Sequence, residues 1–282
     1  MEMRTRIFNK MTAQEVEDYL ARGGNTIFVG VGVIEVHGAM PIDAETIMPE
    51  AYALAMAEKA DGLAMINLPY MFPGGTIVSN ATVQVTVRQS IDFLMMIGRS
   101  LVAQGFRKIF FISGHNPADL YIDAMCRDFF QETKIHCCHL KPGMFGRDMS
   151  KPFSFGDSPW IYSGYGAYKI MGQMEYLPID PDAPDPETRM GQEVSPIQRE
   201  LSAALRPFGG KTSIYYSSSK EHGGGRAFRS EEERLEVCTR GEQEIRDKVA
   251  KMDLERLKNA IDAYHAHVRQ IMKEHPRLAG QY

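Results

Sequence analysis

Residues 26–38 read TIFVGVGVIEVHG, a run of β-branched and apolar residues that ends in charged ones. The apolar part predicts a buried β-strand. Glu35 and His37 come at its end, and two more acids, Asp43 and Glu45, follow shortly after them. Because charged groups at the end of a core strand lose solvation, they need either contact with water or a cationic partner. The stretch therefore predicts a core strand that ends either in a solvated loop or at a bound cation.

Strands and helices are expected to alternate along most of the chain. Apolar runs predict strands at 26–33, 62–70, 108–116 and 134–140, and helical spacing predicts helices at 12–21, 48–60, 87–104, 117–130 and, as two helices, 230–273. Parallel strands joined by helices form sheets that are covered on both faces. The sequence therefore predicts an α/β fold, a three-layer α/β/α sandwich with a mostly parallel central sheet.

The middle of the chain has a different character. Between about residue 141 and residue 196 the periodic pattern gives way to Gly, Pro and aromatic residues. Long irregular segments inside compact domains are lids, interface loops or solvated excursions. We therefore expect a single domain over residues 1–282 with a protruding middle segment at about 141–196.

The composition argues against some classes of function. The chain of 282 residues has 32 Lys and Arg against 36 Asp and Glu, a net charge of -4, and no basic block of the kind that follows nucleic acid. It has no apolar run typical of a signal peptide or a membrane span. Its 4 cysteines lack CxxC spacing, which is typical of reduced thiols. We therefore expect a cytoplasmic protein with no nucleic-acid or membrane partner.

A second polar group follows the predicted strand at 108–116, which ends in Ser-Gly-His115-Asn. In parallel sheets ligands gather beyond the carboxyl ends of the strands, so His115 is expected near Glu35 and His37. With Glu45 these residues offer carboxylate and imidazole ligands without thiolate, a set that suits zinc, manganese or iron. The alternative is an ordinary loop ion pair and a structural histidine, since a lone E-x-H motif is a weak signal.

Four stretches, 35–38, 44–46, 72–76 and 113–116, read EVHG, AET, FPGGT and SGHN. They resemble the E-Q-H-G, T-D-T, F-P-G-T and N-G-H-x-x-N motifs of the creatininase (creatinine amidohydrolase) family. The stretch AFRSEEERLEVCTRGEQ, residues 227–243, resembles the closing helix of that family. The resemblance implies a creatininase-like fold and a hydrolase that depends on a divalent metal, zinc or manganese.

The resemblance also implies a set of metal ligands. Glu35 and His115 would hold one ion, His37 would help to hold a second, and Glu45 would bridge the two where the family has Asp. Asp43 is the alternative bridging acid, but Glu45 is preferred because Thr46 follows it as Thr follows the family's acid. Pro117 stands where creatininase has a glutamate ligand of the second metal, which leaves one ion or two as alternatives.

The expected chemistry is the opening of a small polar cyclic substrate by metal-activated water. The metal would lower the pKa of a bound water and polarise the substrate carbonyl. A general acid would then protonate the leaving atom, and the unranked candidates for this role are Glu175, Tyr165 and His222.

Two substrate classes fit the resemblance. The family is named for hydrolysis of a C–N bond in a cyclic amide or amidine, whereas its 3-dehydro-scyllo-inosose hydrolase branch hydrolyses a C–C bond in a keto-inositol. Pro117 and the lack of a clear match to the family's H-A-G-E-x-E-T-S segment favour the second class. A non-catalytic metal-binding or ligand-binding scaffold is a further alternative. The resemblance also implies a homo-oligomer, commonly a hexamer.

Overall fold

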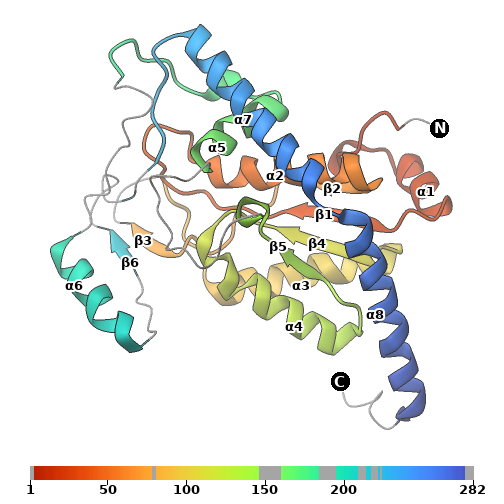
Figure 1. Cartoon of the computed structure of the whole chain (residues 1–282). Helices are drawn as coiled ribbons and strands as arrows, with labels where there is room; N and C mark the ends of the chain where they lie inside the picture. The colour runs from red at the N-terminus through yellow and green to blue at the C-terminus, as the bar shows by residue number, and fades with distance from the viewer. Residues whose placement is uncertain are drawn as a thin grey trace.

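A four-stranded parallel sheet lies at the centre of the protein (Figure 1). The computed structural model describes residues 3–77, 81–145, 160–183, 195–208, 214–216, 222 and 224–276. The strands follow the order β2-β1-β4-β5 and all neighbouring pairs are parallel. Their bounds are Thr26–Gly30 for β1, Leu63–Met65 for β2, Lys108–Ile112 for β4 and Cys138–Leu140 for β5.

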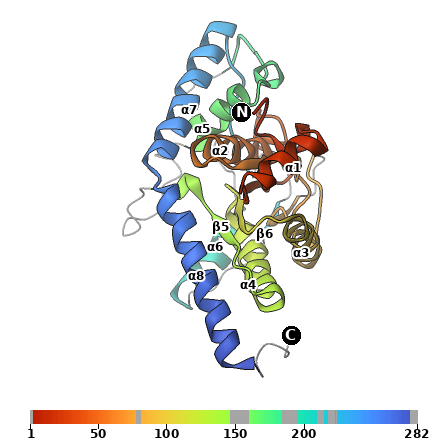
Figure 2. The same ribbon diagram turned by 90° about the vertical axis from the view of Figure 1, so that its right-hand side faces the viewer.

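Helices cover both faces of this sheet, as the two views in Figures 1 and 2 show. One face carries α2 (Ala44–Ala60), α5 (Trp160–Ile170) and α7 (Glu231–Lys251), with α8 (Leu254–Glu274) continuing along the same core. The other face carries α1 (Ala13–Ala21), α3 (Val87–Gln104) and α4 (Ile122–Thr133). The predicted α/β fold with its parallel central sheet is therefore confirmed.

The alternation of side chains along the strands builds a core on each face. Phe28 and Phe110 stack with ring centroids 5.0 Å apart in the core that includes α2. Their neighbours Val29 and Phe111 belong to the core that includes α3 and α4. Because both faces are buried, the strands have nearly continuous apolar sequences.

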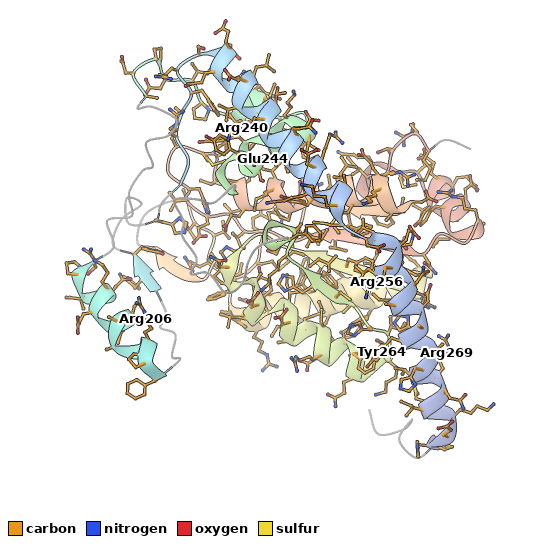
Figure 3. All side chains as sticks on the ribbon, in the orientation of Figure 1. Arg206, Arg240, Glu244, Arg256, Tyr264 and Arg269 are labelled. Atoms are coloured by element: carbon orange, nitrogen blue, oxygen red, sulfur yellow. The ribbon has the colours of Figure 1, made fainter. Side chains whose placement is uncertain are left out.

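Smaller elements surround this sandwich. A second, two-stranded parallel sheet joins β3 (Gly75–Ile77) to β6 (Ile214–Tyr216). Helix α6 (Pro196–Leu205) has no buried residue, and Figure 3 shows it with Arg206 away from the central sheet. The short 3₁₀ helices are η1 (Phe8–Lys10), η2 (Asn116–Leu120), η3 (Pro142–Met144), η4 (Met174–Tyr176) and η5 (Arg206–Phe208). Among the described helices, none combines the length and the apolar character that crossing a bilayer requires.

Local capping explains where several helices begin and end. Thr12 forms a capping box with Glu15 at the start of α1, and Thr86 forms one with Gln89 at the start of α3. Gly105 ends α3 with a φ of 115°, a conformation that favours glycine. The helix expected from residue 48 begins earlier, at Ala44. The carbonyl oxygen of Asp43 already accepts hydrogen bonds from the N–H groups of Thr46 and Ile47. Glu45 consequently lies in the first turn of α2.

The middle segment differs from its prediction. Residues 141–196 were expected to protrude, but α5 within this range is part of the core, with Tyr165 and Tyr168 buried. Small residues allow α5 to pack closely on α7, and these same glycines made the stretch resemble a loop. Residues 146–159 and 184–194 lie outside the described part of the chain. The prediction of one domain over residues 1–282 stays a prediction.

Glu50 on α2 is a buried acid that is expected to make the stability of the protein depend on pH. Its side chain is buried and accepts a hydrogen bond of 2.7 Å from the backbone N–H of Asn67. Burial raises its pKa from 4.5 to about 7. Because the folded state binds this proton more tightly than the unfolded state, the resulting stabilisation is full below about pH 4.5 and is lost as the pH rises through about 7.

We expect Glu50→Gln to remove this pH dependence, because glutamine keeps the acceptor oxygen and carries no charge. The variant should match the wild type at pH 4.5. At pH 8 it should be more stable by about 3 kcal/mol, since one pKa unit corresponds to about 1.4 kcal/mol and the pKa of Glu50 rises from 4.5 to about 7. Urea unfolding of both proteins with a metal chelator at the two pH values measures this difference. A difference in stability that is equal at both pH values would contradict the prediction.

Candidate metal centre

The topology of the sheet places the predicted ligands together. β1 and β4 are adjacent and parallel, with Gly30 opposite Ile112, so the chain leaves both strands at the same edge. The N–H of Val31 still donates to the carbonyl oxygen of Ile112 over 2.8 Å. Beyond this point the chain that follows β1 carries Glu35 and His37, and the chain that follows β4 carries His115.

The start of α2 is tied to the same region. The Thr46 hydroxyl donates to the carbonyl oxygen of Val33 over 2.9 Å, and the N–H of Glu35 donates to the carbonyl oxygen of Ile42 over 2.9 Å. These bonds hold the first turn of α2 against the segment that carries Glu35. The N-terminal end of a helix also favours a nearby carboxylate, so this is a suitable place for Glu45.

All four predicted metal ligands meet in one buried cluster. Nδ1 of His115 contacts Oε2 of Glu45 and lies 3.9 Å from Oε2 of Glu35. Nε2 of His37 lies 3.5 Å from Oε1 of Glu45. Each of the four residues is at most 7% exposed. The expected convergence of these side chains is therefore observed, and their role as ligands stays a prediction.

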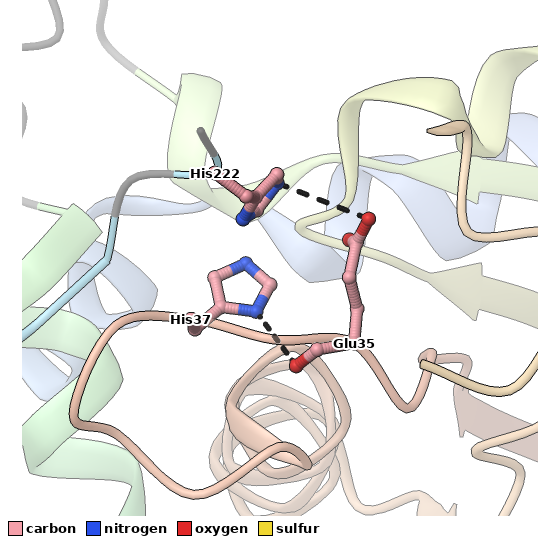
Figure 4. Close-up of side chains that lie close together, drawn as sticks. All are labelled: Glu35, His37 and His222. Atoms are coloured by element: carbon pink, nitrogen blue, oxygen red, sulfur yellow. Dashed lines mark hydrogen bonds and ion pairs between the residues drawn. The ribbon is translucent and has the colours of Figure 1, made fainter. Parts of the chain in front are cut away.

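His222 joins this cluster from a distant part of the chain, as Figure 4 shows. Its Nε2 lies 3.8 Å from Oε1 of Glu35. Its ring packs edge to face on His37, with 4.7 Å between the ring centroids. Of the three predicted general acids, His222 is thus the one that the structure brings to the predicted ligands.

The charges of the cluster depend strongly on one another. Burial raises the pKa of Glu35, to which Glu45 adds, so that it reaches about 7. Burial alone would also raise the pKa of Glu45, but His115 and His37 outweigh it and lower that pKa. Burial disfavours the charged form of His37, yet the nearby carboxylates raise its pKa to about 9. The two acids therefore need positive charge close to them.

The donor set fits a divalent metal ion. Oε2 of Glu35 and Nε2 of His115 are buried and form no hydrogen bond. Within this cluster, two groups have ligand atoms that all lie within 4.8 Å of one another, and both include Glu35. Glu35, Glu45 and His115 form one group, and Glu35, His37 and His222 form the other. Carboxylate oxygens and imidazole nitrogens without thiolate suit zinc or manganese.

Comparisons with known proteins agree with this geometry. The family model described as creatininase, creatinine amidohydrolase, matches residues 9–163, which is more than half of the chain. The chain belongs to the creatininase family. This is a family of metal-dependent hydrolases, and the predicted resemblance is confirmed.

Solved structures show the same fold. One, named "Putative creatinine amidohydrolase from Bacteroides fragilis NCTC 9343", has a TM-score of 0.60 at 17% identity, covering 93% of this chain and 98% of that chain. Another, named "Creatininase Mn", has a TM-score of 0.53 at 19% identity over 87% of this chain and 99% of that chain. A creatininase variant of the Zn-Zn type has a TM-score of 0.52 at 20% identity over 88% and 99%. No curated protein sequence matches the chain significantly.

The alternative bridging acid, Asp43, has another partner in this creatininase-family chain. Its Oδ1 accepts a hydrogen bond of 2.5 Å from the hydroxyl of Tyr168. Asp43 occupies the N-cap position of α2, next to the helix that carries Glu45. The geometry therefore favours Glu45 over Asp43 as the acid that faces both His37 and His115.

The two other predicted general acids have different positions. The hydroxyl of Tyr165 donates to the carbonyl oxygen of Arg226 over 3.1 Å and accepts from the N–H of Arg226 over 2.8 Å. It therefore fixes the backbone of that loop rather than facing the cluster. Glu175 lies on η4 and is exposed to solvent, whereas the cluster is buried. No sequence pattern indicated these contacts, since they depend on how α5 packs.

A close backbone contact holds His37 in place. A Cβ on Gly224 would lie 2.0 Å from the carbonyl carbon of His37, and the N–H of Ala39 donates to the carbonyl oxygen of Gly225 over 2.9 Å. The glycines before Arg226 thus let two loops touch directly at the edge of the cluster.

We expect Gly224→Ala to weaken metal binding by at least about 10-fold, because the added methyl group displaces His37 from the cluster. Loss of a group that orients a metal ligand lowers metal affinity by about 10-fold to 100-fold. Isothermal titration with Mn²⁺ measures the affinity. The matched control is Gly143→Ala, since a Cβ on Gly143 would have no atom within 4 Å. Equal Mn²⁺ affinities for the two variants would contradict the assigned role of this contact.

Proposed function

We propose that the protein is a hydrolase that depends on a divalent metal and opens a small polar cyclic substrate. The observation that carries this proposal is the buried group of Glu35, Glu45 and His115, in which two carboxylates and an imidazole converge and keep unpartnered ligand atoms. Such a group is costly to bury unless a cation is bound to it. Membership of the creatininase family supports the same conclusion.

Glu35, Glu45, His37 and His115 would hold the metal, which is zinc or manganese in this proposal. Creatininase structures named for these two metals support the choice. A divalent ion at this place supplies Lewis-acid activation of water and of the substrate carbonyl. The carboxylates balance its charge, and the burial of all four side chains excludes bulk water from their ligand atoms.

The substrate that we propose is a keto-inositol of the 3-dehydro-scyllo-inosose type. Water adds its oxygen to one carbonyl carbon of the β-diketone, the C–C bond breaks, and its electron pair leaves as an enolate that later takes a proton. Hydrolysis of a C–N bond instead requires a positioned general acid that protonates the leaving nitrogen. Because Glu175 is exposed and the Tyr165 hydroxyl is bound to Arg226, the C–C reaction demands less of this chain.

Direct assays test this proposal. The purified protein, loaded with Mn²⁺ or Zn²⁺, is incubated separately with 3-dehydro-scyllo-inosose and with creatinine, and mass spectrometry follows the gain of one water. We expect ring opening of the keto-inositol. Ring opening of creatinine alone would assign the chain to C–N hydrolysis, the second candidate, which the family description favours. Bound metal without turnover of any cyclic substrate would favour a scaffold.

Two further expectations belong to this proposal. The family resemblance implies a homo-oligomer, commonly a hexamer, and light scattering of the purified protein tests it. The 4 cysteines are all free among the described residues, which supports the predicted cytoplasmic location. Both stay predictions.

A further inference from the structure

By the family resemblance, Pro117 stands where a glutamate would hold a second metal ion, so a second site would lack one ligand. Its ring has no ligand atom, and it packs on the backbone of Gly74, where an added Cβ would lie 2.1 Å from its Cγ. Pro117 also occupies the first turn of η2, where its lack of an N–H is tolerated. A side chain from elsewhere is therefore needed if a second ion is to bind beside His37.

Both carboxylates of the cluster face in two directions. Glu45 presents Oε2 to His115 and Oε1 to His37. Glu35 presents Oε2 towards His115, at 3.9 Å, and Oε1 towards His222, at 3.8 Å. The cluster therefore has two halves that share both acids, one built on His115 and the other on His37 and His222.

We propose that His222 completes a second metal site with His37, Glu35 and Glu45, and thereby replaces the ligand that is missing at Pro117. This inference rests on the proposed metal-dependent function. Three observations carry it: Nε2 of His222 lies 3.8 Å from Glu35, its ring packs on His37, and the three residues have ligand atoms that all lie within 4.8 Å of one another. One carboxylate oxygen of each acid would then serve each ion.

The surrounding backbone holds His222 over the cluster. Gly224 contacts the carbonyl group of His37, and Gly38 pairs with Gly225 in a parallel bridge. The ring of Tyr216 packs edge to face on His222, with 5.4 Å between the centroids. His222 is thus fixed from two sides, as a ligand of a preformed site needs to be. Its contacts lie with the predicted ligands, so it acts as a ligand rather than as the general acid.

Metal stoichiometry tests this inference without an activity assay. Mn²⁺ is titrated into the wild type, His222→Ala, His222→Glu and the control His267→Ala. Inductively coupled plasma mass spectrometry then gives the number of bound ions per chain. His267 is exposed on α8, far along the chain from the predicted ligands. We expect two ions in the wild type, in the control and in His222→Glu, which restores a ligand atom. His222→Ala should keep one ion and bind the second at least about 100-fold more weakly, since even outer-shell partners contribute about 10-fold to 100-fold.

Electron paramagnetic resonance of the Mn²⁺-loaded proteins gives a second readout. Two ions that share carboxylates produce a spin-coupled spectrum, and His222→Ala should show the spectrum of an isolated ion. One ion in the wild type, or two coupled ions in His222→Ala, overturns the role of His222 and leaves the proposed metal-dependent function standing. No bound ion in the wild type overturns both. Circular dichroism of each variant is the control that checks whether it is folded.

Discussion

Glu45→Gln is expected to abolish tight metal binding and turnover. Glu45 faces two histidines of the cluster, which follow the adjacent strands β1 and β4. His115 lies at one of its carboxylate oxygens and His37 at the other. Glutamine keeps the volume but removes the negative charge and replaces one acceptor oxygen by an NH₂ group. We expect a loss in Mn²⁺ affinity and in kcat/KM of more than about 100-fold each, because outer-shell partners alone contribute about 10-fold to 100-fold.

The matched control is Asp43→Asn, which makes the same chemical change two positions earlier. Asp43 accepts its hydrogen bond from Tyr168, and an asparagine oxygen can still accept it. Metal binding by this variant should stay within a few-fold of the wild type. Loss of metal in Asp43→Asn together with its retention in Glu45→Gln would transfer the bridging role to Asp43. Elemental analysis after dialysis, combined with the ring-opening assay, measures both effects.

The convergence of the ligands could be predicted because it follows from topology. Two adjacent parallel strands end at the same edge, so the segments that follow them are expected near each other. His115 was placed correctly on this basis. The strand before Glu35 was expected to extend to residue 33, but β1 ends at Gly30, and the chain beyond it continues as a loop fixed by hydrogen bonds.

The partners of distant side chains could not be predicted in the same way. His222 is far from His37 along the chain, and no local pattern indicates that Gly224 and Gly225 would bring their loop into contact with the backbone of His37 and Ala39. Tyr165 and Glu175 belong to the segment whose character was least clear from its sequence. Their positions depend on α5, whose glycines are used for close packing on α7 rather than for a flexible loop.

Gly241→Ala is expected to destabilise the protein although it replaces a helix-interior glycine. An ordinary change of this kind stabilises a helix by about 1 kcal/mol. Here a Cβ on Gly241 would lie 1.9 Å from the carbonyl oxygen of Tyr162 on α5. Since that oxygen is a main-chain atom, it cannot rotate away, and the two helices are forced apart. Arg240 and Glu244, which Figure 3 labels, lie on α7 before and after Gly241 in the sequence.

The expected net loss is about 2 kcal/mol, since overpacking a core costs about 1–3 kcal/mol. Thermal unfolding should show a lower Tm for Gly241→Ala than for the wild type, and Gly143→Ala, whose added methyl group meets no atom within 4 Å, is the control. The damage should also reach the metal centre, because Tyr165 on α5 holds the Arg226 backbone beside the glycines that contact His37. Unchanged stability would mean that α5 and α7 can separate at no cost, which contradicts the close backbone contact between them.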